Sequence, residues 1–286
     1  MNNWYVFTLA ALVLFGIQRF LYKVSAEENC STAVTTFTFM GTVTCLSLLL
    51  FFARGEGIEN VPRLSFIALV NSLSFFAGTV LTIESLKHLP ASVVMPLVRL
   101  NIVPVVLYGM FVFGDQPSPW QKAGIVTALA VIIILARSPA SAGESRGNAV
   151  RGVLYAMTAL CAGAVAAVSS AHAAHTVNKP AFMALSYFLG TLFAIALLRR
   201  GGTPRRGEAS KKAFLIGPAI GLVNFGGFYF LLQALARGPL ALIIPVTGLS
   251  FVVAVLLSLI VYGEKIDAAR GLALVLTIIA VVMMRF

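Results

Sequence analysis

Long apolar stretches separated by short polar breaks run the whole length of the sequence. A helix needs about 20 apolar residues to cross the roughly 30 Å of hydrocarbon in a bilayer. By this measure the sequence predicts about ten membrane spans, at residues 4–24, 32–53, 64–86, 91–113, 120–136, 150–171, 180–198, 213–235, 240–262 and 268–284. Each span is expected to be helical, because lipid offers the backbone no hydrogen-bond partner.

The breaks between the spans carry turn residues, and the one at residues 137–149, near the middle of the sequence, divides the chain. We therefore predict two domains of five spans each, at residues 1–139 and 149–286. Because five is an odd number, the second domain must lie upside down relative to the first. The expected fold class is an all-α integral membrane protein with about ten transmembrane helices, arranged as two inverted five-helix repeats.

A weak internal repeat supports a duplication. Residues 86–124 fall on residues 235–273 when they are shifted by roughly 149 positions. The matched landmarks are Pro90 with Pro239, Pro96 with Pro245, Leu100 with Leu249, Gly114 with Gly263, and Asp115 with Glu264. Duplicated helical units are typical of secondary transporters, whose substrate site lies between the halves near the bilayer midplane.

Composition excludes a soluble protein, because hydrophobic residues make up 59% of the chain and charged residues only 11%, against about 25% charged residues in a soluble domain. The three cysteines lack the paired spacing of a metal site or a disulfide framework. No phosphate-binding glycine loop, metal-spaced set of histidines and carboxylates, or nucleophile elbow is present in the sequence. We expect neither an enzyme, nor a cofactor, nor an ATP-driven pump.

The formal charge of +11 lies mostly in short loops, so it indicates membrane topology rather than a nucleic-acid partner. Because successive spans cross the membrane in opposite directions, thirteen Lys and Arg residues of the loops and span ends lie on one side of the membrane and six on the other. The positive-inside rule assigns the richer side, which includes residues 199–212, to the cytoplasm. We therefore predict a multi-pass protein of the cell (inner) membrane with both termini outside.

These features together resemble a known family. Two five-span halves, each with a proline-bearing span, a Gly-acidic pair and a last span, resemble the drug/metabolite transporter superfamily and its EamA-type ten-helix members. The residues concerned are Pro96, Gly114-Asp115 and Gln121-Lys122-Ala123-Gly124 in one half, and Pro245, Gly263-Glu264-Lys265 and Arg270-Gly271 in the other. The resemblance implies transport of a small metabolite.

Asp115 stands where this family more often has glutamate. Either carboxylate can stabilise the positive N-terminal end of the helix that follows, so we expect a structural role for Asp115 and Glu264.

Pro96 and Pro245 occupy matched positions in two apolar spans. Proline removes a backbone hydrogen bond and kinks a helix. Spans interrupted in this way at corresponding positions of two halves point to the binding site of a transporter. The alternative is a packing kink without substrate contact.

Charged residues inside the spans are a second pointer to a site. Arg19, Glu84 and Arg99 approach the same side of the membrane. A charge at the centre of a spanning helix costs about 2.5–3.5 kcal/mol on insertion scales, so such residues usually face a partner or a wet cavity. Arg99 lies deepest, about 12 Å inside its span at 1.5 Å per residue.

The repeat shift pairs the region around Arg99 with polar, uncharged residues. Glu84 falls on Gln233, and Asn101 falls on Ser250, close to Thr247. We therefore include these residues in the predicted substrate site.

Two interpretations of Arg99 remain open. Its planar guanidinium group can face the cavity and bind an anionic group of the substrate, or it can pair with Glu84 and hold two helices together. Arg19 can contribute to the site or extend to the membrane interface.

Other polar residues within the spans also have two interpretations. Asn71, Asn224 and Tyr229 are candidate cavity residues, and hydrogen bonding between helices explains them equally well. Gly217 and Gly221 favour close helix packing, either within this protein or in a homodimer.

The expected function is secondary, non-ATP transport of a small anionic or zwitterionic metabolite by alternating access between the two halves. Its partners would be the small-molecule substrate and membrane lipids. The alternative is a lipid-handling or accessory membrane protein whose basic vestibule binds lipid head groups.

Overall fold

The computed structural model describes residues 3–28, 30–86, 88–89, 94, 97–136, 149–200, 208–262 and 268–286. Within these ranges the chain is helical, with short connections and no strand. The helices are α1 (Asn3–Glu27), α2 (Thr32–Arg54), α3 (Val61–Leu86), α5 (Ile102–Phe111), α6 (Pro119–Ala136), α7 (Ala149–Thr176), α8 (Lys179–Arg200), α9 (Glu208–Leu235), α10 (Leu240–Gly248), α11 (Phe251–Tyr262) and α12 (Ala268–Met283).

Local sequence signals set several helix ends. Before α6, the Ser118 backbone N–H donates to Gln121 Oε1 at 2.9 Å, and the Gln121 backbone N–H donates to Ser118 Oγ at 3.2 Å. This reciprocal capping box satisfies two backbone donors, and Pro119 occupies the first helical position, where its missing N–H is not needed. α2 ends at Gly55, whose φ of 60° is a left-handed conformation that favours glycine.

The helices account for the predicted spans. Seven are long and apolar enough to cross a membrane, and three shorter apolar helices cover Leu97–Phe111, Pro119–Ile134 and Gly271–Met283 within the described residues. One of the seven, Leu240–Tyr262, comprises α10 and α11 together. The prediction of a ten-span, all-α membrane protein is confirmed.

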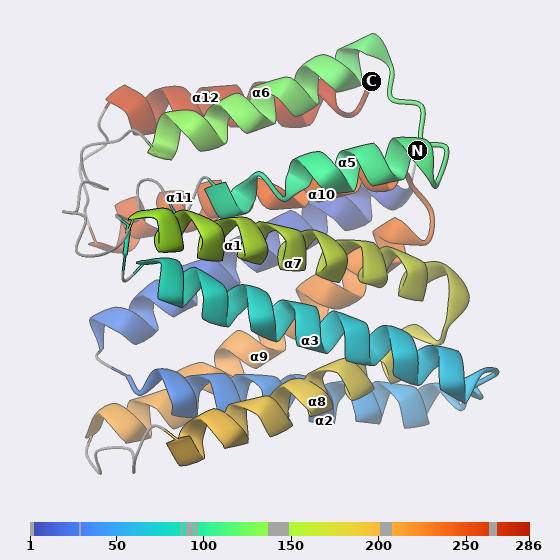
Figure 1. The fold of residues 1–286 in the computed structure, drawn as a ribbon, viewed down its shortest axis with the longest axis vertical. Helices are drawn as coiled ribbons and strands as arrows, with labels where there is room; N and C mark the ends of the chain where they lie inside the picture. Colours follow the sequence, from blue (N-terminus) through green and yellow to red (C-terminus); the bar gives the residue numbers. More distant parts are fainter. Residues whose placement is uncertain are drawn as a thin grey trace.

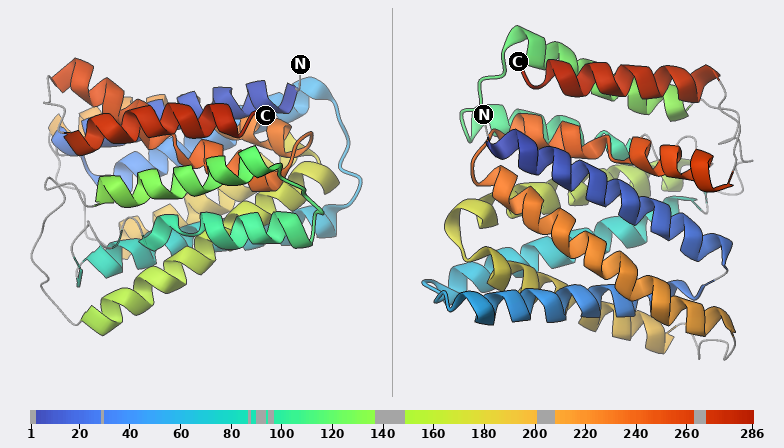
Figure 2. Two further views of the ribbon diagram at one scale, coloured as in Figure 1. Left: turned by 90° about the horizontal axis from the view of Figure 1, so that it is seen from above. Right: turned by 180° about the vertical axis from the view of Figure 1, so that it is seen from behind.

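The helices run back and forth across a single bundle, roughly parallel or antiparallel to one another, with both chain termini at the same end (Figure 1). We call this end, with the connections at residues 55–60, 112–118, 177–178 and 236–239, the terminal face, and the other end the opposite face. α1 runs away from the terminal face, whereas α7 runs toward it (Figures 1 and 2). The second half is therefore inverted relative to the first, as the odd number of spans predicted.

Contacts between helices obey the symmetry of an inverted repeat. The pair α3–α7 has its counterpart in α9–α1, and the pair α2–α9 has its counterpart in α8–α3. The pairs α2–α8 and α6–α12 each join matched elements of the two halves, and α5 contacts α10, so the matched fourth and ninth spans also meet. Figure 1 shows α6 with α12 at one edge of the bundle and α2 with α8 at the other. Exchanging the halves therefore preserves the pattern of contacts, which indicates a pseudo-two-fold relation between them.

Gly217 and Gly221 pack within the chain. A Cβ atom at Gly221 would lie 2.7 Å from Thr42 Cβ and 2.9 Å from the carbonyl oxygen of Phe39. At Gly217 it would meet Thr38 and the carbonyl oxygen of Thr35. These glycines therefore allow α9 to approach α2 closely.

Candidate functional site

The fourth and ninth spans are interrupted at matched positions. The chain leaves the helix at Leu100–Asn101 in the first half and at Leu249–Ser250 in the second. At both places the backbone forms tighter i to i−3 hydrogen bonds: Leu100 N to Leu97 O and Asn101 N to Val98 O, both 3.2 Å, and Leu249 N to Val246 O and Ser250 N to Thr247 O, both 3.1 Å. All four residue pairs correspond under the repeat shift.

The interruption differs from the predicted proline kink. Pro245 lies buried inside α10, and the helix continues to Gly248 before it breaks. The N–H that proline lacks would have bonded one turn earlier, toward Ala241, so the proline weakens the helix before the break and not at the break itself. Pro96, its counterpart, lies outside the described residues.

The two interruptions lie side by side near the middle of the bundle. A Cβ atom at Gly248, before the second break, would lie 2.9 Å from Ile102 Cδ1, directly after the first break. Ser250 follows Leu240, the first residue of its span, by about 15 Å at 1.5 Å per residue, which is half of a hydrocarbon core of roughly 30 Å. The breaks therefore meet close to the expected bilayer midplane.

A guanidinium group accompanies each break. Arg19 of α1 donates from Nε to Ser250 Oγ at 2.9 Å, and Ser250 is fully buried. Arg99 directly precedes the first break and is partly buried. Among the residues that the structure describes, no hydrogen bond or ion pair involves the Arg99 guanidinium, and none joins it to Glu84.

Glycines on α1 and α7 allow these helices to approach the breaks closely. A Cβ atom at Gly16 of α1 would lie 2.7 Å from the carbonyl oxygen of Ser250, and one at Gly163 of α7 would lie 2.7 Å from Asn101 Nδ2. Thr247, also in this region, donates its hydroxyl to its own helix, to the carbonyl oxygens of Ile243 and Ile244.

The region around the breaks suits an anion. α5 and α11 begin at the breaks, so the positive ends of two helix dipoles lie beside two guanidinium groups. Arg19, Arg99, Asn101, Thr247 and Ser250, all predicted from sequence as site residues, come from these neighbouring segments.

Asn71 and Asn224 form hydrogen bonds between helices of opposite halves. Asn71 Nδ2 lies 2.9 Å from the hydroxyls of both Ser169 and Ser170 on α7. Asn224 Nδ2 donates to Gln18 Oε1 on α1 at 3.0 Å, and Asn224 Oδ1 accepts from the Tyr187 hydroxyl. Each half thus uses an asparagine of its third span to hold the first span of the other half, which agrees with the helix-bonding interpretation.

Two cavities lie at the terminal face. The larger, of about 1000 Å³, is bounded by the end of α2, the α7–α8 turn and the end of α9. The smaller, of about 630 Å³, lies between the α5–α6 connection and the start of α10. His175 and Arg237 line both. Of the residues predicted from sequence, Tyr229 and Gln233 line the larger cavity.

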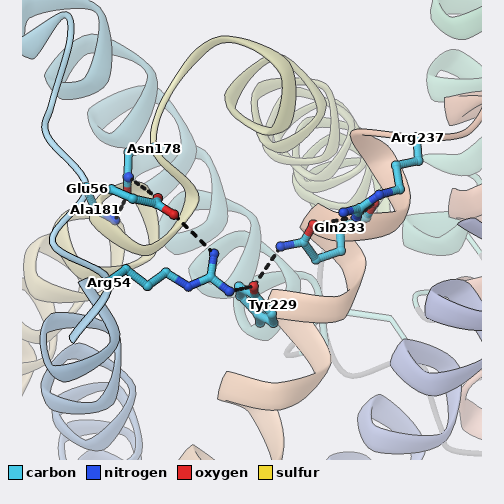
Figure 3. Close-up of polar contacts among 7 residues, drawn as sticks. All are labelled: Arg54, Glu56, Asn178, Ala181, Tyr229, Gln233 and Arg237. Atoms are coloured by element: carbon cyan, nitrogen blue, oxygen red, sulfur yellow. Dashed lines mark hydrogen bonds and ion pairs between the residues drawn. The ribbon is translucent and has the colours of Figure 1, made fainter. Parts of the chain in front are cut away.

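Hydrogen bonds and an ion pair link side chains (Figure 3), most of which line the larger cavity. Asn178 Nδ2 donates to Glu56 Oε2 at 2.7 Å, and Glu56 Oε1 lies 3.5 Å from Arg54 Nη1. Arg54 donates to the Tyr229 hydroxyl, which also accepts from Gln233 Nε2 at 2.8 Å.

Arg237 adds to these contacts by donating to the side chain and the carbonyl oxygen of Gln233. Sequence reasoning missed Arg54, Glu56, Lys179 and Arg237, because charges at the ends of spans are ordinary in membrane proteins and only the fold brings these together.

Asp115 lines the smaller cavity, and it caps a different helix from the one that the sequence predicted. Its Oδ2 accepts from the Ala241 N–H at 2.8 Å, so it caps α10 of the other half and not the helix that follows it in sequence. Gly109 makes room for the carboxylate, since a Cβ atom there would lie 2.6 Å from Asp115 Oδ2. Glu264, its counterpart in the second half, lies outside the described residues.

The environment of Asp115 shifts its titration. Burial raises the pKa of the Asp115 carboxyl above its ordinary value, while the Ala241 and Leu240 N–H groups and the charge of His175 lower it. Burial has the larger effect, so the pKa is raised overall.

Comparisons with known proteins agree with this architecture. The sequence model of a family described as the EamA-like transporter family matches residues 2–137 and 150–286. No curated protein matches the chain. Among solved structures, one titled "Crystal structure of protein" is 18% identical and has a TM-score of 0.77, covering 99% of this chain and 96% of that chain. At this identity the likeness shows the fold alone.

Proposed function

The chain belongs to the EamA-like transporter family, whose members are membrane transporters of the drug/metabolite transporter superfamily, and from this premise we propose that it carries a small anionic or zwitterionic metabolite by secondary transport. The two halves would expose the solute alternately to the two sides of the membrane. The proposed binding region is the pair of helix breaks near the midplane, which matches the general location of sites in transporters built from inverted repeats.

The single observation that carries the proposal is the environment of Arg99. Its guanidinium group lies at a helix break near the midplane, and no described residue pairs with it. A guanidinium group in a membrane span is costly unless it meets a partner or water. A carboxylate or phosphate group of the solute would supply that partner through two parallel hydrogen bonds.

Arg19 and the helix starts support the same choice of solute. The N-termini of α5 and α11 favour a negative charge. Arg19 holds Ser250 at the second break, so this arginine is assigned a positioning role beside Arg99. The positive groups outnumber the anions of the region, which argues against a cationic solute.

Alternating access requires that the two faces open in turn. Both described cavities open at the terminal face. At the opposite face, Lys212 pairs with Glu28, and Lys23 Nζ lies 4.9 Å from the centre of the Tyr262 ring. We assign the terminal face to the outside on the Lys and Arg distribution, so this arrangement corresponds to an outward-open conformation.

Proteoliposomes that contain the purified full chain test the proposal. Each vesicle batch receives one radiolabelled solute from a panel of amino acids, organic acids, sugar phosphates, neutral sugars and organic cations, without ATP. We expect saturable uptake, accelerated by unlabelled solute inside, for anionic or zwitterionic compounds only. Uptake confined to neutral or cationic compounds would contradict the charge assignment. Movement of fluorescent lipid without uptake of any solute would favour the lipid-handling alternative.

A further inference from the structure

The larger cavity at the terminal face, which we call the vestibule, holds three basic side chains. Arg54 comes from the end of α2, Lys179 from the start of α8, and Arg237 from the α9–α10 connection. Two carboxylates, Glu56 and Glu59, also line it. The three cations come from both halves of the chain and meet only in the folded protein.

The cations differ in how far the protein itself satisfies them. Arg54 bonds to the Tyr229 hydroxyl and pairs with Glu56. Arg237 bonds to Gln233, and its guanidinium carbon lies 5.0 Å from the centre of the Phe7 ring.

Lys179 has a different environment from the two arginines. It is partly buried, and its ammonium group forms no hydrogen bond or ion pair with any residue in the described part of the chain. The charges close enough to act on it are those of Arg237, Glu56 and Arg54, of which two repel it.

Glu56 is the vestibule carboxylate that pairs with one of the three cations. Its Oε2 accepts a hydrogen bond from Asn178 Nδ2 at 2.7 Å, and its Oε1 lies 3.5 Å from Arg54 Nη1. It therefore occupies one cation while leaving Lys179 and part of Arg237 available. An incoming carboxylate or phosphate would meet a net positive wall in a recess, where local charge raises the concentration of anions.

We propose that the vestibule is a second anion site, which binds the carboxylate or phosphate of the solute before it reaches Arg99. Lys179 and Arg237 bind the anion, the Tyr229 and Phe7 rings contact the apolar part of the solute, and Glu56 competes with the anion for the cations. This inference rests on the proposed function, because an entry site has meaning only if a solute passes through the protein.

Because Glu56 competes with the anion, the proposal predicts opposite changes in affinity for two substitutions. Binding of citrate and of inorganic phosphate to the purified full chain in a neutral detergent is measured by titration calorimetry at constant ionic strength, against chloride. Lys179→Gln should weaken binding about tenfold, which is the loss expected for one charged hydrogen bond. Glu56→Gln should tighten binding several-fold, because it removes the competing anion. Lys122→Gln, an exposed lysine on the terminal face outside the vestibule, is the matched control and should bind as the wild type does.

Further arms separate this inference from the proposed function. Arg99→Ala should retain vestibule binding, so two separable sites would support the inference. Loss of binding in Arg99→Ala together with normal binding in Lys179→Gln would overturn the vestibule site and leave the midplane site standing. Weaker binding in Glu56→Gln would also overturn it. Stabilisation by phosphatidylglycerol nanodiscs alone, absent in Lys179→Gln and without any effect of free citrate or phosphate, would identify a lipid head group and contradict an entry site.

Discussion

The two helix breaks have the same pattern of backbone hydrogen bonds but carry different side chains. Leu100–Asn101 and Leu249–Ser250 have corresponding tight hydrogen bonds, and both breaks lie at the centre of the bundle. Arg99 precedes the first break, whereas Gly248 holds the matching position before the second. Arg19, the guanidinium at the second break, also belongs to the first half. Duplication thus explains the shared discontinuity, while the positive charge comes from one half only.

This asymmetry has a consequence for binding. A symmetric site would offer the solute two equivalent charges, but of the two guanidinium groups at the breaks only that of Arg99 has no partner among the described residues. Arg19 already bonds to Ser250. The first break would therefore contribute most of the affinity for the solute. The second break would form part of the wall of the site and add the dipole of its helix.

The greatest difference in affinity should separate the two arginines. Arg99→Ala should weaken binding of the transported anion roughly 10- to 150-fold, the range for losing hydrogen bonds to a charged group. Arg19→Ala should weaken it less than about fivefold, because a bond within the protein is lost and not a bond to the solute. Equilibrium binding of the labelled solute identified in the uptake panel measures both. Equal losses of affinity in the two variants would contradict a site in which Arg99 supplies most of the binding.

The glycines that contact the breaks allow the packing to be compared. In Gly16→Ala the new Cβ would meet Val253 Cβ at 2.3 Å and the Ser250 carbonyl oxygen at 2.7 Å. We expect the free energy of unfolding to fall by about 1–3 kcal/mol, the usual cost of overpacking. Gly163→Ala should cost less, because the atom it meets ends the rotatable side chain of Asn101.

Unfolding of these variants in detergent is followed by loss of helical circular dichroism. Gly41→Ala is the control, since a Cβ atom at Gly41 would have no neighbouring atom within 4 Å. A larger loss in Gly163→Ala than in Gly16→Ala would show that the first break is packed more rigidly than the second.

The cap formed by Asp115 predicts a pH dependence. Because burial raises the pKa of this carboxyl, its contribution to stability is complete below the ordinary unfolded value of about 3.9 and is lost as pH rises through the folded value. Asp115→Asn keeps an oxygen that can accept from Ala241 but cannot titrate. Between the unfolded and the folded pKa of this carboxyl, the unfolding temperature of the wild type should therefore fall with rising pH more steeply than that of Asp115→Asn.

Glu59→Gln, which changes an exposed carboxylate on the same face, is the control for this measurement and should follow the wild type. Equal pH slopes in the wild type and Asp115→Asn would remove Asp115 as the titrating group.

The weakest effect on affinity concerns Glu84. Its counterpart in the second half is Gln233, so Glu84→Gln makes the halves alike at this position. Because no ion pair joins Glu84 to Arg99 in the described part of the chain, we expect solute affinity to change by less than about twofold. Loss of the pH dependence of uptake in Glu84→Gln, with binding retained, would favour proton carriage by this residue. Retained pH dependence would argue against proton carriage by this residue.

The sequence was sufficient to predict the spans and their inversion, and it predicted an interruption of the fourth and ninth spans, although at their prolines and not at the observed breaks. Apolar length alone distinguishes spans, and the repeat shift placed Asn101 opposite Ser250, as the two breaks confirm. The break itself lies beyond Pro245, where Arg19 and Gly16 of another helix approach Ser250. No local pattern contains that information.

The vestibule and the Asp115 cap could not be predicted for the same reason. Arg54 and Arg237 are far apart in sequence, and each looks like an ordinary interfacial charge at the end of a span. Asp115 satisfies a backbone N–H of Ala241 in the other half, although an acidic residue before a helix favours the interpretation as a cap of that helix. Contacts between the halves decide both cases.

Uptake by Arg99 variants in proteoliposomes decides whether this arginine binds the transported anion. Wild type, Arg99→Lys, Arg99→Ala and the exposed control Arg63→Ala are reconstituted at equal density after their folding has been verified by circular dichroism. We predict normal uptake of the anionic solute by Arg63→Ala, reduced uptake by Arg99→Lys, which keeps the charge but loses the planar fork, and none by Arg99→Ala. Uptake by folded Arg99→Ala at the wild-type rate would contradict a substrate-binding role for Arg99.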